Sequence, residues 1–320
     1  FWTNYLWWVN LMQSFGRAPL ELIAHIAEND LPYTEILTAN YMMANDLIAD
    51  ITRSGGVSPD FDVKDRQTWS FMEFRPTQDR GQVRHDEFRE GEDREFGIEI
   101  IAHSGFIDFE HVGLLNAPSF LARYPSTETN RNRARARWTY KHFLGVDIEK
   151  SASRTTDPVA LADKNNPTLN NPACTVCHRV MDPVAGAFQD YGNEGIFRDA
   201  FGAMDSLPNS YKFPEAGTPE AEAALYQEGD TWYRDMLPPG MPGETAPGGN
   251  SLRWLAERIT ADDRFATATV EFWWPAVMGR ELLEAPEVAS DRYFDEQLRA
   301  YEAQQAVVEQ LADGFRDGFG

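Results

Sequence analysis

One short segment of the chain combines two cysteines and a histidine at a spacing that can do chemistry. It reads Cys174-Thr-Val-Cys177-His178, and these two cysteines are the only ones in the 320 residues. On the first turns of a helix, thiols three residues apart can both reach the vinyl groups on one edge of a haem. His178 then directs its imidazole toward the iron. The motif predicts one covalently attached haem c, bound through Cys174 and Cys177, with His178 as the proximal iron ligand.

Two other uses of the same residues remain open. A redox-active dithiol also has two cysteines three residues apart, and the pair has the form of one half of a zinc site. A zinc site would need two more ligands, and neither could be cysteine. None of the other histidines has paired zinc-ligand spacing; these are His25, His85, His103, His111 and His142.

The sixth iron ligand decides between electron transfer and the binding of small molecules. Axial His/Met ligation is typical of cytochromes c, whereas an open position lets a small molecule reach the iron. Met236 and Met241 lie in a proline-rich loop downstream of the motif, where small cytochromes c present their distal methionine. His111 is the alternative metal ligand. Either methionine could instead only pack against the haem edge or the core.

The elements that must position these residues are predicted to be mainly helical. Apolar residues at helical spacing, capping residues and glycine stops define them. Pro19 is expected in the first turn of a helix, and the motif helix is expected to open at Asn171 or Pro172. A short strand is expected at 69–74, and long loops at 57–95 and 146–171. The other predicted helices are 33–51, 114–124, 129–144, 220–226, 251–260, 262–278 with a kink at Pro275, and 293–315.

This order predicts a mainly α fold class, with helical domains and long irregular loops around a c-type haem. We expect an N-terminal helical domain with a charged loop at 1–95 and a haem-binding, cytochrome c-like domain at 96–248. A C-terminal helical domain is expected at 249–320. No internal repeat is visible in the sequence.

The charge and the distribution of apolar residues indicate which classes of partner the chain can bind. The formal charge of −22 argues against nucleic acid, and it favours docking to a basic redox partner protein. No apolar run reaches the length of a membrane span, so none is expected in this chain. The chain starts and ends in apolar, helix-like stretches, which suggests a piece of a longer precursor with further domains.

Arginines at alternate positions form the one basic cluster of this acidic chain. They are Arg131, Arg133, Arg135 and Arg137. Pairing with the surplus of acidic side chains is one expectation. The other is that one of them, or Lys141, neutralises a haem propionate.

Four segments of the chain carry a family resemblance: Pro125-Ser-Thr-Glu-Thr-Asn-Arg-Asn-Arg133, Phe143-Leu-Gly-Val-Asp-Ile148, Asn171-Pro-Ala-Cys-Thr-Val-Cys-His178 and Met181-Asp-Pro183. They resemble a family of large secreted proteins from planctomycetes and marine gammaproteobacteria, the planctomycete-type cytochrome c proteins. The resemblance implies exported haem proteins with no settled activity. The segment Trp232-Tyr-Arg-Asp-Met236 is similar to members of the family and favours Met236 over Met241, while His111 matches a histidine found in part of it.

These observations predict an exported mono-haem cytochrome that transfers electrons outside the cytoplasm. Because bacteria attach haem to cysteines outside the cytoplasm, we expect a periplasmic or extracellular location. The alternative is a haem enzyme or sensor with an open distal site, acting on peroxide, oxygen or a polymer. A scaffold protein with a structural haem is a third possibility. We favour electron transfer over an enzyme.

Overall fold

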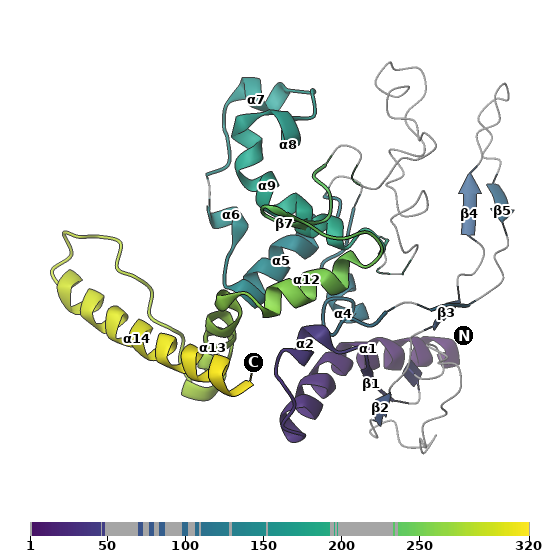
Figure 1. Cartoon of the computed structure of the whole chain (residues 1–320), viewed down its shortest axis with the longest axis horizontal. Helices are drawn as coiled ribbons and strands as arrows, with labels where there is room; N and C mark the ends of the chain where they lie inside the picture. The colour runs from purple at the N-terminus through teal and green to yellow at the C-terminus, as the bar shows by residue number, and fades with distance from the viewer. Residues whose placement is uncertain are drawn as a thin grey trace.

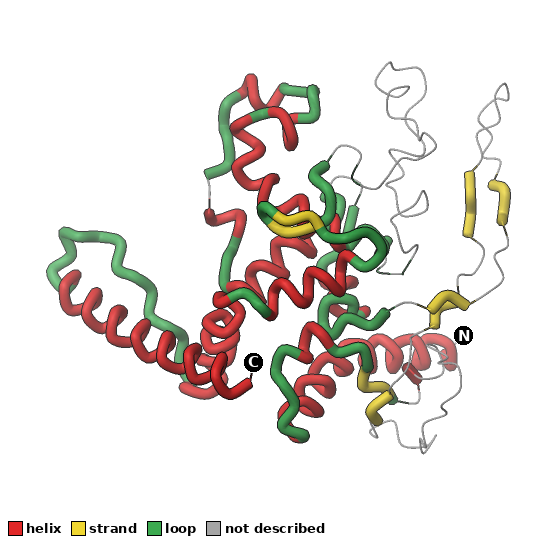
Figure 2. Tube along the Cα trace, in the orientation of Figure 1, coloured by secondary structure: helices red, strands yellow, loops and turns green. Residues whose placement is uncertain are grey.

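The protein is a mainly α structure, as predicted (Figures 1 and 2). The computed structural model describes residues 2–45, 47–48, 110–127, 130–151, 153–192, 195, 197, 233 and 236–319, and five short strands between residues 70 and 108. The predicted helix at 220–226 lies outside these residues. None of the described helices is long and apolar enough to cross a bilayer.

The first helix, α1 (Trp2–Glu28), contains Pro19 in its interior. The prediction that Pro19 begins a helix is therefore wrong. Leu11 on one side of the proline and Leu22 and Ile26 on the other are all buried. Burial of this apolar stripe on both sides outweighs the one backbone hydrogen bond that a proline removes from a helix.

The prediction of one continuous helix at 33–51 is also wrong. Helix α2 (Glu35–Thr38) is only one turn long, and strand β1 (Met42–Ala44) follows it. All three residues of β1 are buried, and the strand pairs antiparallel with β2 (Ser70–Met72). Strand β2 confirms the strand expected at 69–74. Pairing with a distant strand, which local spacing does not reveal, decides this segment.

Four further short strands form two antiparallel pairs. Strand β3 (Thr77–Asp79) pairs with β6 (Phe106–Asp108), and β4 (Val83–Asp86) pairs with β5 (Ile98–Ile101). His85 lies on β4, whereas His103 lies outside the described residues. The long loop predicted at 57–95 therefore contains strands.

The segment before the motif is more helical than expected. Helix α4 (Pro118–Arg123) is shorter than predicted, and α5 (Arg133–Leu144) starts a few residues late, because Arg131 and Asn132 have positive φ. Gly145 ends α5 in the left-handed conformation, as predicted. Three short helices interrupt the predicted loop at 146–171: α6 (Ile148–Ser151), α7 (Pro158–Ala162) and α8 (Pro167–Asn170).

The motif helix and the C-terminal helices follow the prediction closely. Helix α9 (Pro172–Ala187) opens at Pro172, and a hairpin of β7 (Gly240–Met241) and β8 (Glu244–Thr245) packs beside it. Helix α12 (Ser251–Thr260) has the predicted bounds. Helices α13 (Asp263–Met278) and α14 (Phe294–Phe319) pack together and extend to one side (Figure 1).

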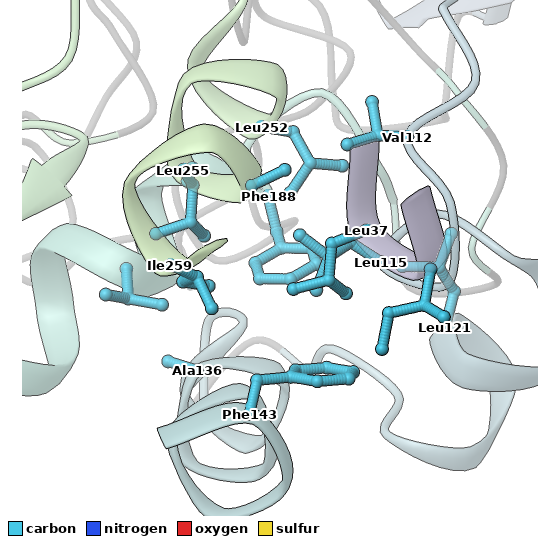
Figure 3. Close-up of a cluster of buried hydrophobic side chains, with 14 of the residues drawn as sticks. Leu37, Val112, Leu115, Leu121, Ala136, Phe143, Phe188, Leu252, Leu255 and Ile259 are labelled. Carbon is cyan, nitrogen blue, oxygen red and sulfur yellow. The ribbon is translucent and has the colours of Figure 1, made fainter. Parts of the chain in front are cut away.

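One apolar core holds α9 in place. It draws side chains from α1, α2, α4, α5, α9, α12 and α13, so all three predicted domains contribute to it. Phe188, just after α9, is fully buried next to the α12 residues Leu252 and Leu255 (Figure 3). The proposed boundaries after residues 95 and 248 stay predictions.

Candidate functional site

The two cysteines lie at the start of α9, on its first two turns. Asn171 caps this helix: its side-chain oxygen accepts a hydrogen bond from the backbone N–H of Ala173 at 3.0 Å. The Asn171 amide donates to the carboxylate of Asp163 at 2.9 Å, which ties the cap to the preceding loop. Pro172 occupies the first helical position, where no N–H is needed. The sequence Asn-Pro therefore fixes where the motif helix begins.

Both thiols are free and partly exposed. At a spacing of three residues on a helix, Cys174 and Cys177 lie on the same side. Cys177 also packs against the main core, whereas Val176 between them is 60% exposed. The pair can therefore be reached from solvent while the helix that carries it remains anchored.

His178 is held through one of its ring nitrogens. Its Nδ1 lies 2.9 Å from Oδ1 of Asp182, one turn further along α9. The imidazole is 20% exposed, whereas the Asp182 carboxylate has no exposed surface. Hydrogen bonding at Nδ1 fixes the ring orientation and leaves Nε2 as the nitrogen available to a metal.

Arg133 of α5 holds the same carboxylate with a two-pronged contact. Its Nε donates to Oδ1 at 2.7 Å and its Nη2 to Oδ2 at 3.0 Å. Burial alone would raise the pKa of Asp182, but the hydrogen bonds from His178 and Arg133 and their charges hold that pKa below its ordinary value. Asp182 is therefore an ionised group between a histidine and an arginine.

Asp182 was not predicted as a site residue, and Arg133 was predicted only as one of several cations that could pair with acidic side chains or with a haem propionate. A signal was present for Asp182, because an acidic residue four positions after a helical histidine lies on the same face. Nothing in the local sequence singles out Arg133 from the neighbouring arginines. Its role depends on α5 packing against α9.

Helix α5 and its N-cap residue also fix the rest of α9. The Tyr140 hydroxyl donates to the Val180 carbonyl at 3.3 Å, and the Asn132 amide donates to the Phe188 carbonyl at 3.1 Å. Fully buried Arg135 donates to the Tyr191 and Gly192 carbonyls, each at 3.0 Å. Burial lowers the pKa of Arg135 to about 10, so it stays protonated at neutral pH.

The arginine cluster therefore divides into separate roles. Arg137 pairs with Asp147 and Glu149 on the surface. This confirms, for Arg137, the prediction that the arginines pair with acidic side chains. Arg133 pairs with a buried acid inside the site, and Arg135 binds backbone carbonyls rather than an acid. Arg131 is buried.

The two candidate methionines lie near the C-terminal half of α9. Met236 is 5% exposed and belongs to the main core, and Met241 on β7 is partly buried against it. Their loop contacts α9 where Pro239 meets Gly186: a Cβ added to Gly186 would lie 3.0 Å from the Pro239 Cα. Gly186 follows His178 by just over two turns, roughly 12 Å along the helix axis.

His111 is buried, and it directly precedes the core residue Val112. Burial, with the nearby charge of Arg253, lowers the pKa of His111 to about 4, so its imidazole is neutral at pH 7. Arg253 of α12 donates to the His111 carbonyl at 2.6 Å and to the Glu110 carboxylate at 2.6 Å. A neutral imidazole can bind a metal, but this one lies in a segment that is tied to α12.

The part of the chain that the structure describes contains no group of three or more His, Cys, Asp or Glu side chains that could hold a metal ion. The described residues therefore do not supply the second half of a zinc site.

One segment of the chain is similar to a known protein family. Residues 111–200 match the PSCyt3 family, described as a protein of unknown function (DUF1588), whose name denotes a cytochrome c-type domain. No curated protein and no solved structure matches the chain. The matched segment contains α4, α5 and α9, and so includes both cysteines, His178, Asp182 and Arg133. This segment of the chain is similar to a cytochrome c-like domain.

Proposed function

We propose that this protein binds one haem c covalently through Cys174 and Cys177, with His178 as an iron ligand, and transfers electrons outside the cytoplasm. The observation that carries the proposal is the arrangement on α9. Two partly exposed thiols lie on one side of its first turns, and the next residue is a histidine held through Nδ1. The similarity of residues 111–200 to a cytochrome c-type family supports it.

The residues fit haem c better than the two alternatives. A redox dithiol of the thioredoxin kind is associated with a βαβ pattern, whereas the element before α9 is the short helix α8. A histidine directly after the second cysteine has no role in that chemistry. In a haem protein it has one, because Nε2 can bind the iron while Asp182 keeps Nδ1 occupied.

Haem would supply the one-electron chemistry, and the chain's own residues would set its position and surroundings. Cys174 and Cys177 would attach the haem to α9, and Cys177 packs against apolar side chains of the main core. Helix α5 fixes α9 through Arg133, Tyr140 and Arg135. A rigid helix that carries both the attachment points and an iron ligand suits electron transfer, because little rearrangement accompanies the reaction.

One observation favours a second candidate, a haem enzyme or sensor with an open distal site. Met236 is buried within the core, which is also what a purely packing role requires. If neither Met236 nor Met241 nor His111 binds the iron, small molecules such as peroxide or oxygen can reach it. The optical spectrum of the ferric protein separates the two, because a closed six-coordinate site is low-spin and an open one is high-spin or water-ligated.

Location and partner follow from the same proposal. Because bacteria attach haem to cysteines outside the cytoplasm, the proposed attachment implies a periplasmic or extracellular location. The charge of −22 favours a basic redox partner. The rate of reduction by a small basic cytochrome should fall as ionic strength rises, since salt screens charge attraction. A rate that does not change with salt contradicts this choice of partner.

The test of attachment is a haem stain after denaturing electrophoresis. The chain is produced as an exported protein in a host that matures c-type cytochromes. We expect a haem band at the mass of the chain, and no band for Cys174→Ala/Cys177→Ala. The control is Val176→Ala, which changes the exposed residue between the cysteines and should keep the band. A wild-type chain without bound haem would reject the proposal.

A further inference from the structure

The bond between His178 and Asp182 has the geometry of a tuning contact. Both residues lie on α9, and the Nδ1 to Oδ1 distance is 2.9 Å. Asp182 has no exposed surface, so water does not compete for this oxygen. A carboxylate that accepts a proton-sharing bond from an imidazole makes the opposite ring nitrogen a stronger electron donor.

Arg133 limits how much negative charge the carboxylate can give to the histidine. Its Nε binds the same oxygen, Oδ1, that His178 contacts, and its Nη2 binds Oδ2. The Arg133 side chain is 16% exposed, so solvent screens its interaction with the buried carboxylate only weakly. The Asp182 carboxylate therefore contacts two groups: the Arg133 guanidinium, which neutralises its charge, and the His178 imidazole, which it polarises.

We propose that Asp182 is a positioning residue that lowers the reduction potential of the iron bound by His178, and that Arg133 opposes this effect. This inference rests on the proposed haem attachment. A more electron-rich imidazole favours the ferric over the ferrous state, so the carboxylate lowers the potential. Arg133 withdraws part of that charge and raises it.

A purely structural role predicts something different. If Asp182 only ties α9 to α5, removing either partner breaks the same contact and loosens the site in the same way. Both variants would then shift the potential in one direction. The tuning role predicts shifts of opposite sign, because one variant removes the negative charge and the other removes the charge that compensates it.

The experiment measures reduction potentials of haem-loaded Asp182→Asn and Arg133→Gln by redox titration. Asp182→Asn keeps an acceptor oxygen but removes the charge, and the potential should rise. We expect a roughly tenfold change in the equilibrium between the ferric and ferrous states, which for one electron is ~59 mV. Arg133→Gln should lower the potential. Equal potentials for wild type and Asp182→Asn, or shifts of the same sign for both variants, would overturn the inference.

Helix α5 offers a matched control. Arg137 contacts Asp147 through Nε at 3.1 Å and Nη2 at 3.0 Å, the same two-pronged pairing without a histidine. Asp147→Asn changes the net charge of the chain by the same amount as Asp182→Asn. It should leave the potential close to that of wild type. A shift as large as that of Asp182→Asn would show a general charge effect and overturn the specific role.

The wild-type chain provides a readout that does not depend on a variant folding. In the reduced protein, the Nδ1 proton of His178 should exchange slowly with D2O and resonate far downfield in NMR, because Asp182 holds it. Fast exchange would overturn the inference even if haem is attached. A wild-type chain that holds no haem rejects both the proposed function and this inference. Attached haem with fast exchange rejects this inference alone, so the two failures can be told apart.

Discussion

The guanidinium of Arg135 donates a hydrogen bond to the backbone carbonyl of Tyr191 at 3.0 Å, although the two residues lie far apart in the sequence. The same group also binds the carbonyls of Tyr124 and Gly192. Carbonyls just after the C-terminal end of α9 thus find a buried cation as their partner. This contact joins α5 to the segment that follows the motif helix.

Arg135→Leu should therefore destabilise the fold strongly. The variant leaves several buried carbonyls without a donor, and the expected loss in the free energy of unfolding is roughly 3–5 kcal/mol. Denaturant unfolding followed by circular dichroism measures it. Arg137→Leu is the control, because Arg137 is partly exposed and pairs with surface acids, so it should cost far less. Equal losses for both variants would contradict the anchoring role.

Gly186→Ala should loosen the loop that carries both candidate methionines. The added Cβ would lie 3.0 Å from the Cα of Pro239 and 3.1 Å from its backbone nitrogen. Overpacking of this kind costs about 1–3 kcal/mol. In α14, Gly314 has no atom within 4 Å of such a Cβ, so Gly314→Ala should stabilise by about 0.5–1 kcal/mol. If Gly186→Ala also stabilises, the loop does not pack on α9 as described.

His142 should make stability depend on pH. Its Nε2 lies 2.9 Å from the Tyr124 hydroxyl, and burial, with the charge of Lys141, lowers its pKa below the ordinary value of 6.5. The folded state therefore binds a proton less readily than the unfolded state. The stability from neutral His142 is complete above pH 6.5 and is lost as pH falls toward the lowered folded pKa.

The measurement compares wild type with His142→Phe in denaturant at about pH 8 and about pH 5, on either side of the ordinary histidine pKa. Wild type should lose more stability over this interval than the variant, because phenylalanine cannot take up a proton. Identical losses would show that His142 titrates normally. The difference between the two proteins removes the contributions of other histidines, including His111.

Met236→Ala should convert a six-coordinate ferric spectrum to a high-spin or water-ligated one, and it should lower the reduction potential. The reason is that loss of a thioether ligand removes the axial His/Met pair. Met241→Ala and His111→Ala are the comparisons. A change only in His111→Ala would favour bis-His ligation and contradict the loop assignment. No change in any of the three would favour an open distal site.

Local signals predicted several elements of this fold well. Asn171-Pro172 fixes the start of α9 through a cap and a proline that needs no N–H, and Gly145 ends α5 in the left-handed region. The bounds of α12 follow from its apolar spacing and its Asn250 cap. In each case the deciding interaction lies within a few residues of the element.

Other elements depend on distant partners, and the sequence could not reveal them. Segment 42–44 is a strand because it pairs with 70–72. Arg135 looked like one of four surface cations, but its burial depends on how α4, α5 and α9 come together. Asp182 could have been found, since it follows His178 by one helical turn. Arg133 could not, because its contact with Asp182 joins two helices.

The most direct test of the whole account is the mass of the intact chain under denaturing conditions. Covalent attachment through Cys174 and Cys177 predicts the mass of the polypeptide plus one haem. The Cys174→Ala/Cys177→Ala variant should show the polypeptide alone. Loss of two hydrogens in the wild-type chain, which indicates a disulfide, or the mass of an unmodified chain from a host that matures c-type cytochromes, would contradict the account.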